Sequence, residues 1–216
     1  MTEPRAAIVA GIDLDEALDE EFREWYLTEH APERLAVTGI ESFTQWWRLE
    51  GDAPRYVSLF EARDRSVLES GLYADLKAHG DTPWSARIKR KADRILRGVY
   101  DEVAVYRVGA SAPFAAVAYT DLPAEEDPAY RDWYDRGHGP AVVSVPGVLG
   151  MRRFEQASSP RHLTIVLIED PAVLQSAEYV AARESAPDPG LRATWSRLRG
   201  VYRLAAVLPR PTADAG

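Results

Sequence analysis

The order of apolar and polar positions near the start of the chain predicts a strand and then an amphipathic helix. Residues 6–12 are an apolar run of small and β-branched side chains that ends at Asp13, which is typical of a buried strand followed by a turn. Asp19 lies where an N-cap is expected, and the positions after it repeat with the spacing of one helical face. The residues on this face are Phe22, Trp25, Tyr26 and His30. Pro32 is expected to kink or end the helix near the histidine.

The positions that follow predict two strands, a second helix and a last strand. Gly39 opens the second strand, and Arg55 lies beside the hairpin that leads to a third strand starting at Tyr56. Residues 66–77 predict the second helix, and the last strand is expected to start near Val99. This order, β-α-β-β-α-β, is that of the split βαβ, or ferredoxin-like, unit.

The same pattern occurs a second time. Residues 6–61 and 114–169 align without gaps at an offset of 108, and a shift of two residues brings the second helices into register. The motif W-Y-x-x-x-H-x-P occurs at residues 25–32 and again at 133–140. Both copies end on R-G-V-Y, at residues 97–100 and 199–202.

These repeats predict a tandem duplication of one small domain. The first ferredoxin-like repeat is assigned to residues 1–108 and the second to residues 114–208, with residues 109–113 as the joint between them. Asp127 and Pro128 predict an N-cap and a first helical position in the second copy, as Asp19 does in the first. Residues 209–216 have no apolar period and are expected to form a flexible tail.

The strands indicate how the two repeats combine. A ferredoxin-like sheet carries both helices on one face, so its other face shows polar alternation if it is exposed to water. Residues 57–60 and 165–168 are instead predominantly apolar at both parities, which indicates burial on both faces. We therefore expect an α+β fold in which the two repeats pack sheet to sheet into one α/β barrel, with the helices outside.

Composition excludes several classes of protein. Of 216 residues, 46% are apolar and 28% charged, which is typical of a globular chain. The formal net charge of −8 argues against a nucleic-acid or anionic-membrane partner, and the absence of cysteine excludes disulfides and thiolate chemistry. No apolar N-terminal segment or long apolar run is present, so we expect a cytoplasmic protein, and the excess of arginine over lysine suggests a bacterial source.

The repeated helix face carries the candidate chemistry. His30 and His138 occupy the same repeat position, and partial burial there can bring an imidazole near neutrality for proton transfer. Tyr26 and Tyr134 can donate to an oxyanion, and Trp25 and Trp133 offer flat apolar walls to a planar ligand. Duplication copies structural residues as well as catalytic ones, so packing between helix and sheet is the alternative interpretation of the motif.

The aromatic-histidine motif resembles a known family. Phe22-x-x-Trp25-Tyr26-x-x-x-His30-x-Pro32, and its second copy from Tyr130 to Pro140, are similar to the EthD-like branch of the dimeric α/β-barrel superfamily. Because members usually build the barrel from two chains, this chain is similar to a fused dimer. The resemblance implies a pocket in each half, used for cofactor-free chemistry on aromatic or polyketide-like molecules, with the helix histidine as acid or base.

The two halves differ around the motif. Thr28-Glu29 in the first becomes Arg136-Gly137 in the second, so one pocket is expected to be catalytic and the other vestigial. His138 is preferred, because Arg136 and the paired Arg152 and Arg153 could hold an anionic substrate. Surface solvation is the alternative account of these arginines.

Other candidates are weaker. Trp46 and Trp47 point to opposite faces of the second strand, so one is expected to line a pocket, with core packing as the alternative for both. No spacing of histidines and acids suggests a metal site, and no glycine-rich motif suggests a nucleotide, so we expect neither metal nor cofactor.

Together these features favour an enzyme of small-molecule metabolism. The principal hypothesis is a cofactor-independent lyase, cyclase, isomerase or decarboxylase that uses His138 or His30 as general acid or base on an aromatic or polyketide-like substrate. The alternatives are a cofactor-free monooxygenase, a haem protein with one of these histidines as axial ligand, and a non-catalytic binding protein. The fusion is expected to give a monomer with an internal pseudo-dimer or a homodimer.

Overall fold

The computed structural model describes residues 5–107, 112–184 and 195–210. Residues 109–111 of the predicted joint and residues 211–216 of the predicted tail therefore lie outside the described residues. The described residues form two compact units. Unit 1 draws on residues 1–47, 54–101 and 205–216, and unit 2 on residues 48–53 and 102–204.

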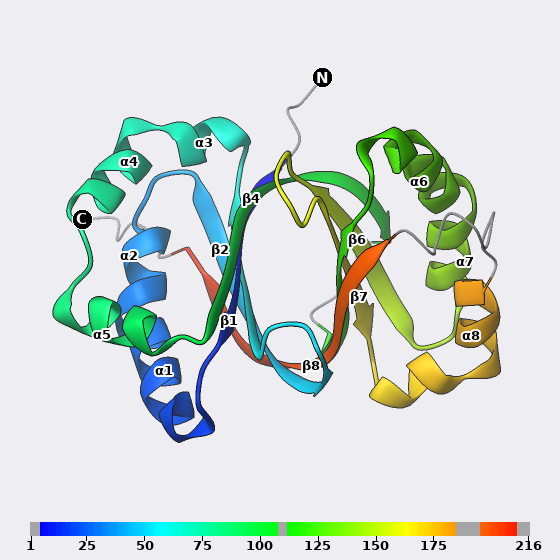
Figure 1. Cartoon of the computed structure of the whole chain (residues 1–216), viewed down its shortest axis with the longest axis horizontal. Coiled ribbons are helices and arrows are strands. Elements are labelled where there is room, and N and C mark those ends of the chain that lie inside the picture. Colours follow the sequence, from blue (N-terminus) through cyan, green and yellow to red (C-terminus); the bar gives the residue numbers. More distant parts are fainter. Residues whose placement is uncertain (1–4, 108–111, 185–194, 211–216) are drawn as a thin grey trace. The chain divides into compact units, whose positions relative to one another are not determined.

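Unit 1 contains two sets of helices on one side of its strands (Figure 1). In chain order its elements are β1 (Ala6–Asp13), η1 (Glu16–Leu18), α1 (Asp19–Trp25), η2 (Tyr26–His30), α2 (Ala31–Leu35), β2 (Ile40–Gly51), β3 (Tyr56–Ala62), α3 (Arg65–Glu69), α4 (Gly71–Ala78), α5 (Pro83–Lys91) and β4 (Arg94–Arg107). All pairings are antiparallel, in the order β2-β3-β1-β4.

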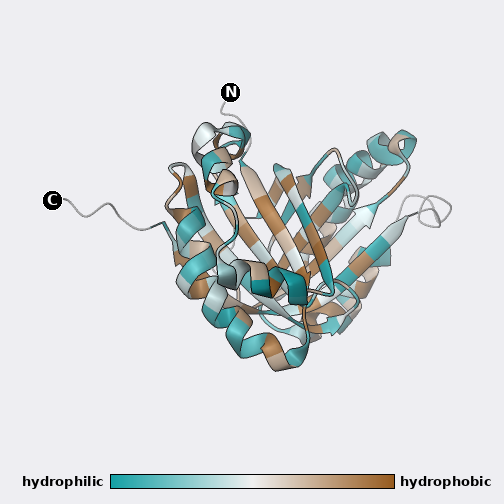
Figure 2. Ribbon diagram, turned by 60° about the vertical axis from the view of Figure 1, so that its left-hand side comes forward, coloured by the Kyte–Doolittle hydropathy of each residue, from teal (hydrophilic) through white to brown (hydrophobic). Residues whose placement is uncertain are grey.

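Unit 2 repeats this arrangement with fewer described helices. Its elements are β5 (Phe114–Asp121), η3 (Ala124–Glu126), α6 (Asp127–Trp133), η4 (Tyr134–His138), α7 (Gly139–Ser144), β6 (Val148–Glu155), β7 (His162–Ile168), η5 (Pro171–Gln175), α8 (Ala177–Glu184) and β8 (Ser196–Pro209). The strands pair antiparallel in the order β6-β7-β5-β8. The outward surfaces of the helices are mainly hydrophilic (Figure 2).

The hydrogen-bonded strand order is β1-β3-β2-β8-β5-β7-β6-β4, a closed barrel. The predicted α+β class and the eight-stranded barrel are therefore confirmed. The last strands begin earlier than predicted, at Arg94 and Ser196 rather than near Val99 and Val201. Their first residues pair with the ends of β1 and β5, and these long-range partners are invisible in a local pattern.

The aligned register of the two halves is wrong in the third strand. The strands β2 and β6 begin at an offset of 108, at Ile40 and Val148, which face Ala62 and Ile168. The strands β3 and β7 themselves, however, correspond at an offset of 106. The two-residue shift lies in the hairpin, where β2 is 12 residues long and β6 only 8. A shift of two preserves which face each side chain occupies, so the burial argument was unaffected.

Asp19 and Asp127 are not the N-caps that the sequence predicted. Each is the first residue of its helix, because the preceding 3₁₀ turn continues directly into the helix. The carboxylate of Asp19 instead accepts a hydrogen bond from Nε of Arg55 at 3.1 Å and another from the hydroxyl of Tyr56. Asp127 makes the equivalent contact with Nε2 of His162 at 2.8 Å. Both aspartates therefore attach a helix to the strand behind it.

Pro32 does not end the helix. A π-helical turn, η2, precedes it, and the N–H of Ala31 donates to the carbonyl of Tyr26, five residues back. Pro32 then lies in the first turn of α2, where its missing N–H costs little, and the helix continues to Leu35. The helix α5 was missed altogether. Its signal was present, since Thr82 accepts a hydrogen bond from the N–H of Ser85 ahead of a proline at the first position.

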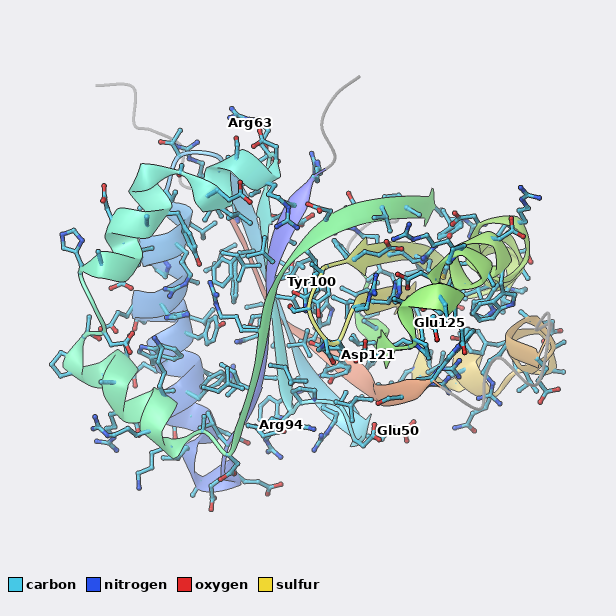
Figure 3. All side chains as sticks on the ribbon, turned by 45° about the horizontal axis from the view of Figure 1, so that its top comes forward. Glu50, Arg63, Arg94, Tyr100, Asp121 and Glu125 are labelled. Carbon is cyan, nitrogen blue, oxygen red and sulfur yellow. The ribbon has the colours of Figure 1, made fainter. Side chains whose placement is uncertain are left out.

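Polar contacts hold the strand end of β1. Asp13 accepts hydrogen bonds from the backbone N–H of Arg55 and from Nε of Arg94, each at 2.6 Å. Arg94 is labelled at the start of β4 in Figure 3. These contacts tie the end of β1 to the hairpin and to the last strand of unit 1.

Candidate functional site

The π-helical turns bring the predicted aromatic and histidine side chains together in each unit. In unit 2, the ring centroid of His138 is 4.3 Å from Trp133, in a stacked arrangement, and 4.8 Å from Tyr134, edge to face. In unit 1 the corresponding distances from His30 are 4.2 Å to Trp25 and 4.8 Å to Tyr26. The sequence therefore identified the members of both clusters, because they share one face of one helix.

A cavity of about 490 Å³ opens beside His138 in unit 2. This volume lies within the range of ligand pockets, which is roughly 300–1,000 Å³. Its apolar wall comes from β5, β7 and η5, through Ala116, Ala118, Val166 and Leu174. Its polar lining includes Tyr134, Thr164, Tyr179, Arg183 and Arg199.

The hydrogen bond of His138 defines the tautomer of its imidazole. Nδ1 lies 3.3 Å from the backbone carbonyl oxygen of Ala182. Because a carbonyl only accepts, Nδ1 carries the proton and Nε2 carries the lone pair in the neutral imidazole. The side chain is 9% exposed and lines the cavity. His138 therefore has the tautomer that a general base acting through Nε2 requires.

Two phenols accompany this histidine. The hydroxyl of Thr164 donates to the phenolic oxygen of Tyr134 at 3.3 Å. This bond does not use the proton of Tyr134, so the phenol can donate it to another acceptor. The guanidinium of Arg153 lies 4.5 Å from the centre of the Tyr134 ring. Burial raises the pKa of Tyr179 to about 12, so this phenol stays protonated and can donate at neutral pH.

The equivalent position in unit 1 is closed. Only about 80 Å³ remains beside His30, and among the described residues its Nδ1 has no hydrogen-bond partner. Burial, with the positive charges of nearby Arg34, Lys89 and Arg97, lowers the pKa of His30 from 6.5 to about 2. An imidazole of this kind is too weak a base to take up a proton near neutrality, so the surroundings oppose the role that the sequence suggested for it.

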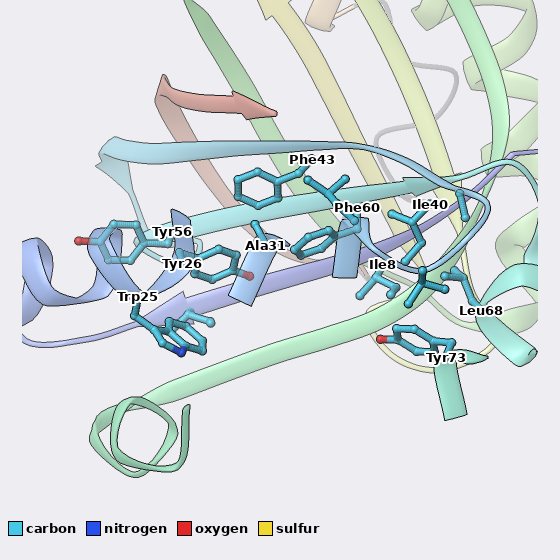
Figure 4. Packing of buried hydrophobic residues seen from close by; sticks show 14 of the residues in the cluster. Ile8, Trp25, Tyr26, Ala31, Ile40, Phe43, Tyr56, Phe60, Leu68 and Tyr73 are labelled. Carbon is cyan, nitrogen blue, oxygen red and sulfur yellow. The ribbon is translucent and has the colours of Figure 1, made fainter. Parts of the chain in front are cut away.

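Side-chain size explains why one space is closed and the other open. In unit 1, Ile8 pairs with Phe60 across β1 and β3, and Phe60 packs near Tyr26 (Figure 4). The corresponding pair in unit 2, three positions into the same register, is Ala116 with Val166. The smaller pair leaves the volume that Phe60 and Ile8 occupy in unit 1.

Helix α5 completes the closure of unit 1. Oε1 of Glu29 accepts hydrogen bonds from three side chains, Nε1 of Trp25 at 3.1 Å, Oγ of Ser85 at 3.1 Å and Oγ1 of Thr82 at 2.6 Å. Two of these donors lie at the start of α5, so Glu29 holds that helix against the histidine turn. Unit 2 has Gly137 at this position, which lacks a side chain to make such contacts.

The predicted anion-binding arginines lie elsewhere. Arg153 is 2% exposed and bonds to Asp135 at 2.8 Å and Glu155 at 3.0 Å, and it is not among the residues that line the cavity. Arg152 bonds to Glu102 at 2.5 Å. Arg136 is 82% exposed and pairs with Asp132 at 2.8 Å, as the solvation alternative anticipated.

Trp46 and Trp47 point to opposite faces of β2, as neighbouring residues of a strand do. The ring of Trp47 packs 5.7 Å from Tyr56, on the helix side of unit 1. Trp46 points to the opposite face, is 4% exposed, and does not line the spaces beside His30 or His138. Its place in the core fits the packing alternative.

The arginines that do line the cavity, Arg183 and Arg199, were missed as site residues. Arg199 begins the repeated R-G-V-Y motif, so the repeat was the available signal. Among the described residues, no group of three or more histidines and acids could hold a metal ion. No helix in the same residues is long and apolar enough to cross a membrane.

Comparison with known proteins shows the fold. No protein-family model matches the chain, and no curated protein matches its sequence. An anthrone oxidase-like protein matches with a TM-score of 0.69 and 10% identity, over 97% of this chain and 94% of its own. A proposed monooxygenase from Fusobacterium nucleatum matches with a TM-score of 0.61 and 9% identity, over 99% and 98%.

A third similar structure is chlorite dismutase from Candidatus Nitrospira defluvii, in complex with imidazole. Its TM-score is 0.62 at 14% identity, over 95% of this chain and 93% of its own. At such identities the likeness concerns the fold alone. The predicted membership of the dimeric α/β-barrel superfamily and of its EthD-like branch stays a prediction.

Proposed function

We propose that the cavity of unit 2 is the active site of a small-molecule enzyme that removes a proton from a planar phenolic or enolisable aromatic substrate. The observation that carries this proposal is the placement of His138. Its Nδ1–H is directed at the carbonyl of Ala182, and its ring lines a cavity of about 490 Å³ beside Tyr134. A site filled by its own tryptophan would favour a structural role, but here Trp133 leaves that volume open.

Each side chain has a distinct part in the proposed reaction. Nε2 of His138 takes the proton from the phenol or from an acidic C–H group, and the imidazolium that forms keeps its Nδ1–H on Ala182. Tyr134 donates its O–H to the oxyanion that develops on the substrate. Ala116, Ala118 and Val166 contact the ring of the substrate and exclude water from it.

The fate of the carbanion distinguishes two reaction classes. Return of the proton from His138 to another carbon gives an isomerisation, and attack of the carbanion on a carbonyl of the same molecule gives a cyclisation. In a decarboxylation, the bond to the carboxylate breaks with loss of CO₂ and His138 protonates the carbon left behind, and none of these reactions needs an oxidant. Reaction of the carbanion with O₂ gives an oxygenation, which the likeness in fold to an anthrone oxidase-like protein and to a proposed monooxygenase supports. We favour oxygenation, and oxygen consumption during turnover separates the two classes.

Haem is a second candidate for the same cavity. A histidine whose Nδ1–H bonds to a backbone carbonyl has the Nε2 lone pair that a metal needs, so His138 would hold the iron of a bound haem. Arg183 and Arg199 would then pair with the propionates. Bound haem would supply one-electron and oxygen chemistry. A Soret band that appears on adding hemin and is lost in H138Q would favour this candidate.

We also propose that the chain belongs to the EthD-like branch, as a tandem fusion of two ferredoxin-like repeats. The motif from Tyr130 to Pro140 supports this assignment, as does the shared order of elements in the two units. The first repeat then keeps the fold of the motif without an open pocket.

His138→Gln tests the proposed function, and His30→Gln is its matched control. Anthrone is the first substrate, with absorbance and oxygen uptake as readouts, followed by hydroxylated naphthalenes. H138Q should lose about 10²–10⁴-fold in kcat, the usual contribution of a general base, whereas H30Q should remain within about twofold. Equal activity of H138Q and the unsubstituted protein on any substrate turned over would contradict the proposal.

A further inference from the structure

A second hollow of about 350 Å³ adjoins the cavity beside His138. The two share Ala118, Tyr134, His138, Arg183 and Arg199 in their linings, so they meet at these side chains. The second hollow extends from the histidine toward the start of β8. A ligand whose ring contacts His138 can therefore reach into it with a substituent.

Positive charge predominates in this extension. Arg183 from α8 and Arg197 and Arg199 from β8 line it, against one carboxylate, Glu184. Arg197 and Arg199 are two residues apart on one strand, so their side chains leave the same face. Their partners in β5 are Thr120 and Ala118, which line the hollow as well.

The arginines differ in how they are held. The guanidinium of Arg197 lies 4.6 Å from the centre of the Trp195 ring, which fixes its plane. Among the described residues, no carboxylate forms an ion pair with the guanidinium of Arg199, which lines both hollows, although Glu50 also lines the larger one. An exposed arginine at a pocket wall without a protein anion suits an anion on the ligand.

Unit 1 lacks this arrangement. Arg97, the counterpart of Arg199, donates to the hydroxyl of Tyr73 at 2.5 Å. Ile95 stands where unit 2 has Arg197, as the matching pairs with β1 and β5 show. The pair of arginines on one strand face is therefore specific to the unit with the open cavity.

We propose that the unit 2 site is selective for planar aromatic molecules that carry a carboxylate, with Arg199 as the main anion-binding residue and Arg197 as its neighbour. The proposal rests on the proposed function, because it uses the same cavity. The aromatic ring lies against the apolar wall at His138, and the carboxylate accepts hydrogen bonds from the guanidinium of Arg199. This deepens the proposed function by naming the substrate class.

The test compares 2-naphthoate with 2-naphthol, which share a ring system and differ in charge at neutral pH. Dissociation constants are measured by calorimetry and by quenching of tryptophan fluorescence. The unsubstituted protein should bind 2-naphthoate at least about tenfold more tightly than 2-naphthol. R199Q should weaken 2-naphthoate binding by about 10- to 100-fold, the usual range for charge-assisted hydrogen bonds, and leave 2-naphthol within about twofold.

R136Q is the matched control, because it removes an exposed positive charge of unit 2 that lies outside both hollows. It should leave both constants unchanged, and R199K should restore part of the preference. No binding of 2-naphthoate up to millimolar concentration, or an unchanged preference in R199Q, overturns the proposal. If H138Q keeps turnover while R199Q loses the preference for 2-naphthoate, the proposed function fails and the anion site stands. If H138Q loses turnover while R199Q keeps that preference, the anion site fails and the proposed function stands.

Discussion

At the scale of single residues, the two repeated histidines show how one residue type acquires two chemistries. His30 and His138 occupy equivalent positions in equivalent π-helical turns and touch equivalent aromatic rings. The two histidines differ in the charges, hydrogen-bond acceptors and free space around their rings. His30 has positive charges near it and almost no space, whereas His138 has a carbonyl at Nδ1 and an open cavity. Local sequence reasoning sees only the shared part.

The buried state of His30 makes a prediction about pH. Its pKa is about 2 in the folded protein and about 6.5 when unfolded, so the unfolded chain takes up the proton first as pH falls. This residue should therefore lower the free energy of unfolding by about 1.4 kcal/mol for each pH unit below 6.5. Urea unfolding of the unsubstituted protein and H30Q at pH 7, 6 and 5 measures the difference, which should move in favour of H30Q.

H79Q provides the control, since it replaces an exposed histidine and should not produce that slope. A difference between the unsubstituted protein and H30Q that stays constant from pH 7 to pH 5 would show that His30 is accessible to protons in the folded state.

At the scale of elements, the helices and strands followed from local pattern wherever one face repeated. The helix from Asp19 and the strand from Ala6 were predicted for this reason. The missed helix α5 was the exception, although Thr82 and Pro83 form the same N-terminal signal that identified the helix at Asp127. Its place over His30 depends on Glu29, a residue far away in sequence.

Loss of the Glu29 carboxylate should loosen α5. In E29A, the hydroxyls of Thr82 and Ser85 lose an acceptor, so we expect the free energy of unfolding to fall by about 1–3 kcal/mol. Hydrogen exchange of the amides of α5 should rise more than that of β1. E24A, which removes an exposed carboxylate from the helix before Glu29, should change the free energy of unfolding by less than about 0.5 kcal/mol. It should leave the hydrogen exchange of α5 unchanged.

At the scale of the whole molecule, the two units share one order of strands, but among the described residues an open cavity lies beside His138 and not beside His30. The pairs Ile8 with Phe60 and Ala116 with Val166 account for the difference. Their positions in the register are equivalent, so the backbone is conserved while the free volume is not. This arrangement makes a prediction about stoichiometry.

One molecule of 2-naphthoate should bind per chain. V166F should abolish binding, because the larger ring fills the unit 2 cavity in the way that Phe60 fills unit 1. F60L, the matched change in unit 1, should keep one site per chain while costing about 1–1.5 kcal/mol of stability. Calorimetry gives the stoichiometry, and two equal sites per chain, or full binding by V166F, would be the contrary result.

The sequence by itself determined the order of the strands, the α+β barrel and the Trp-Tyr-His face of each first helix, although it did not reveal α5. These features depend on the period of apolar and polar residues, which can be read within one short segment of the chain. The tertiary structure alone decided which histidine faces a cavity and which arginines line it. Those properties depend on side chains that meet across paired strands and on a helix held by a distant carboxylate, because free volume and local charge arise only once segments remote in sequence are packed together.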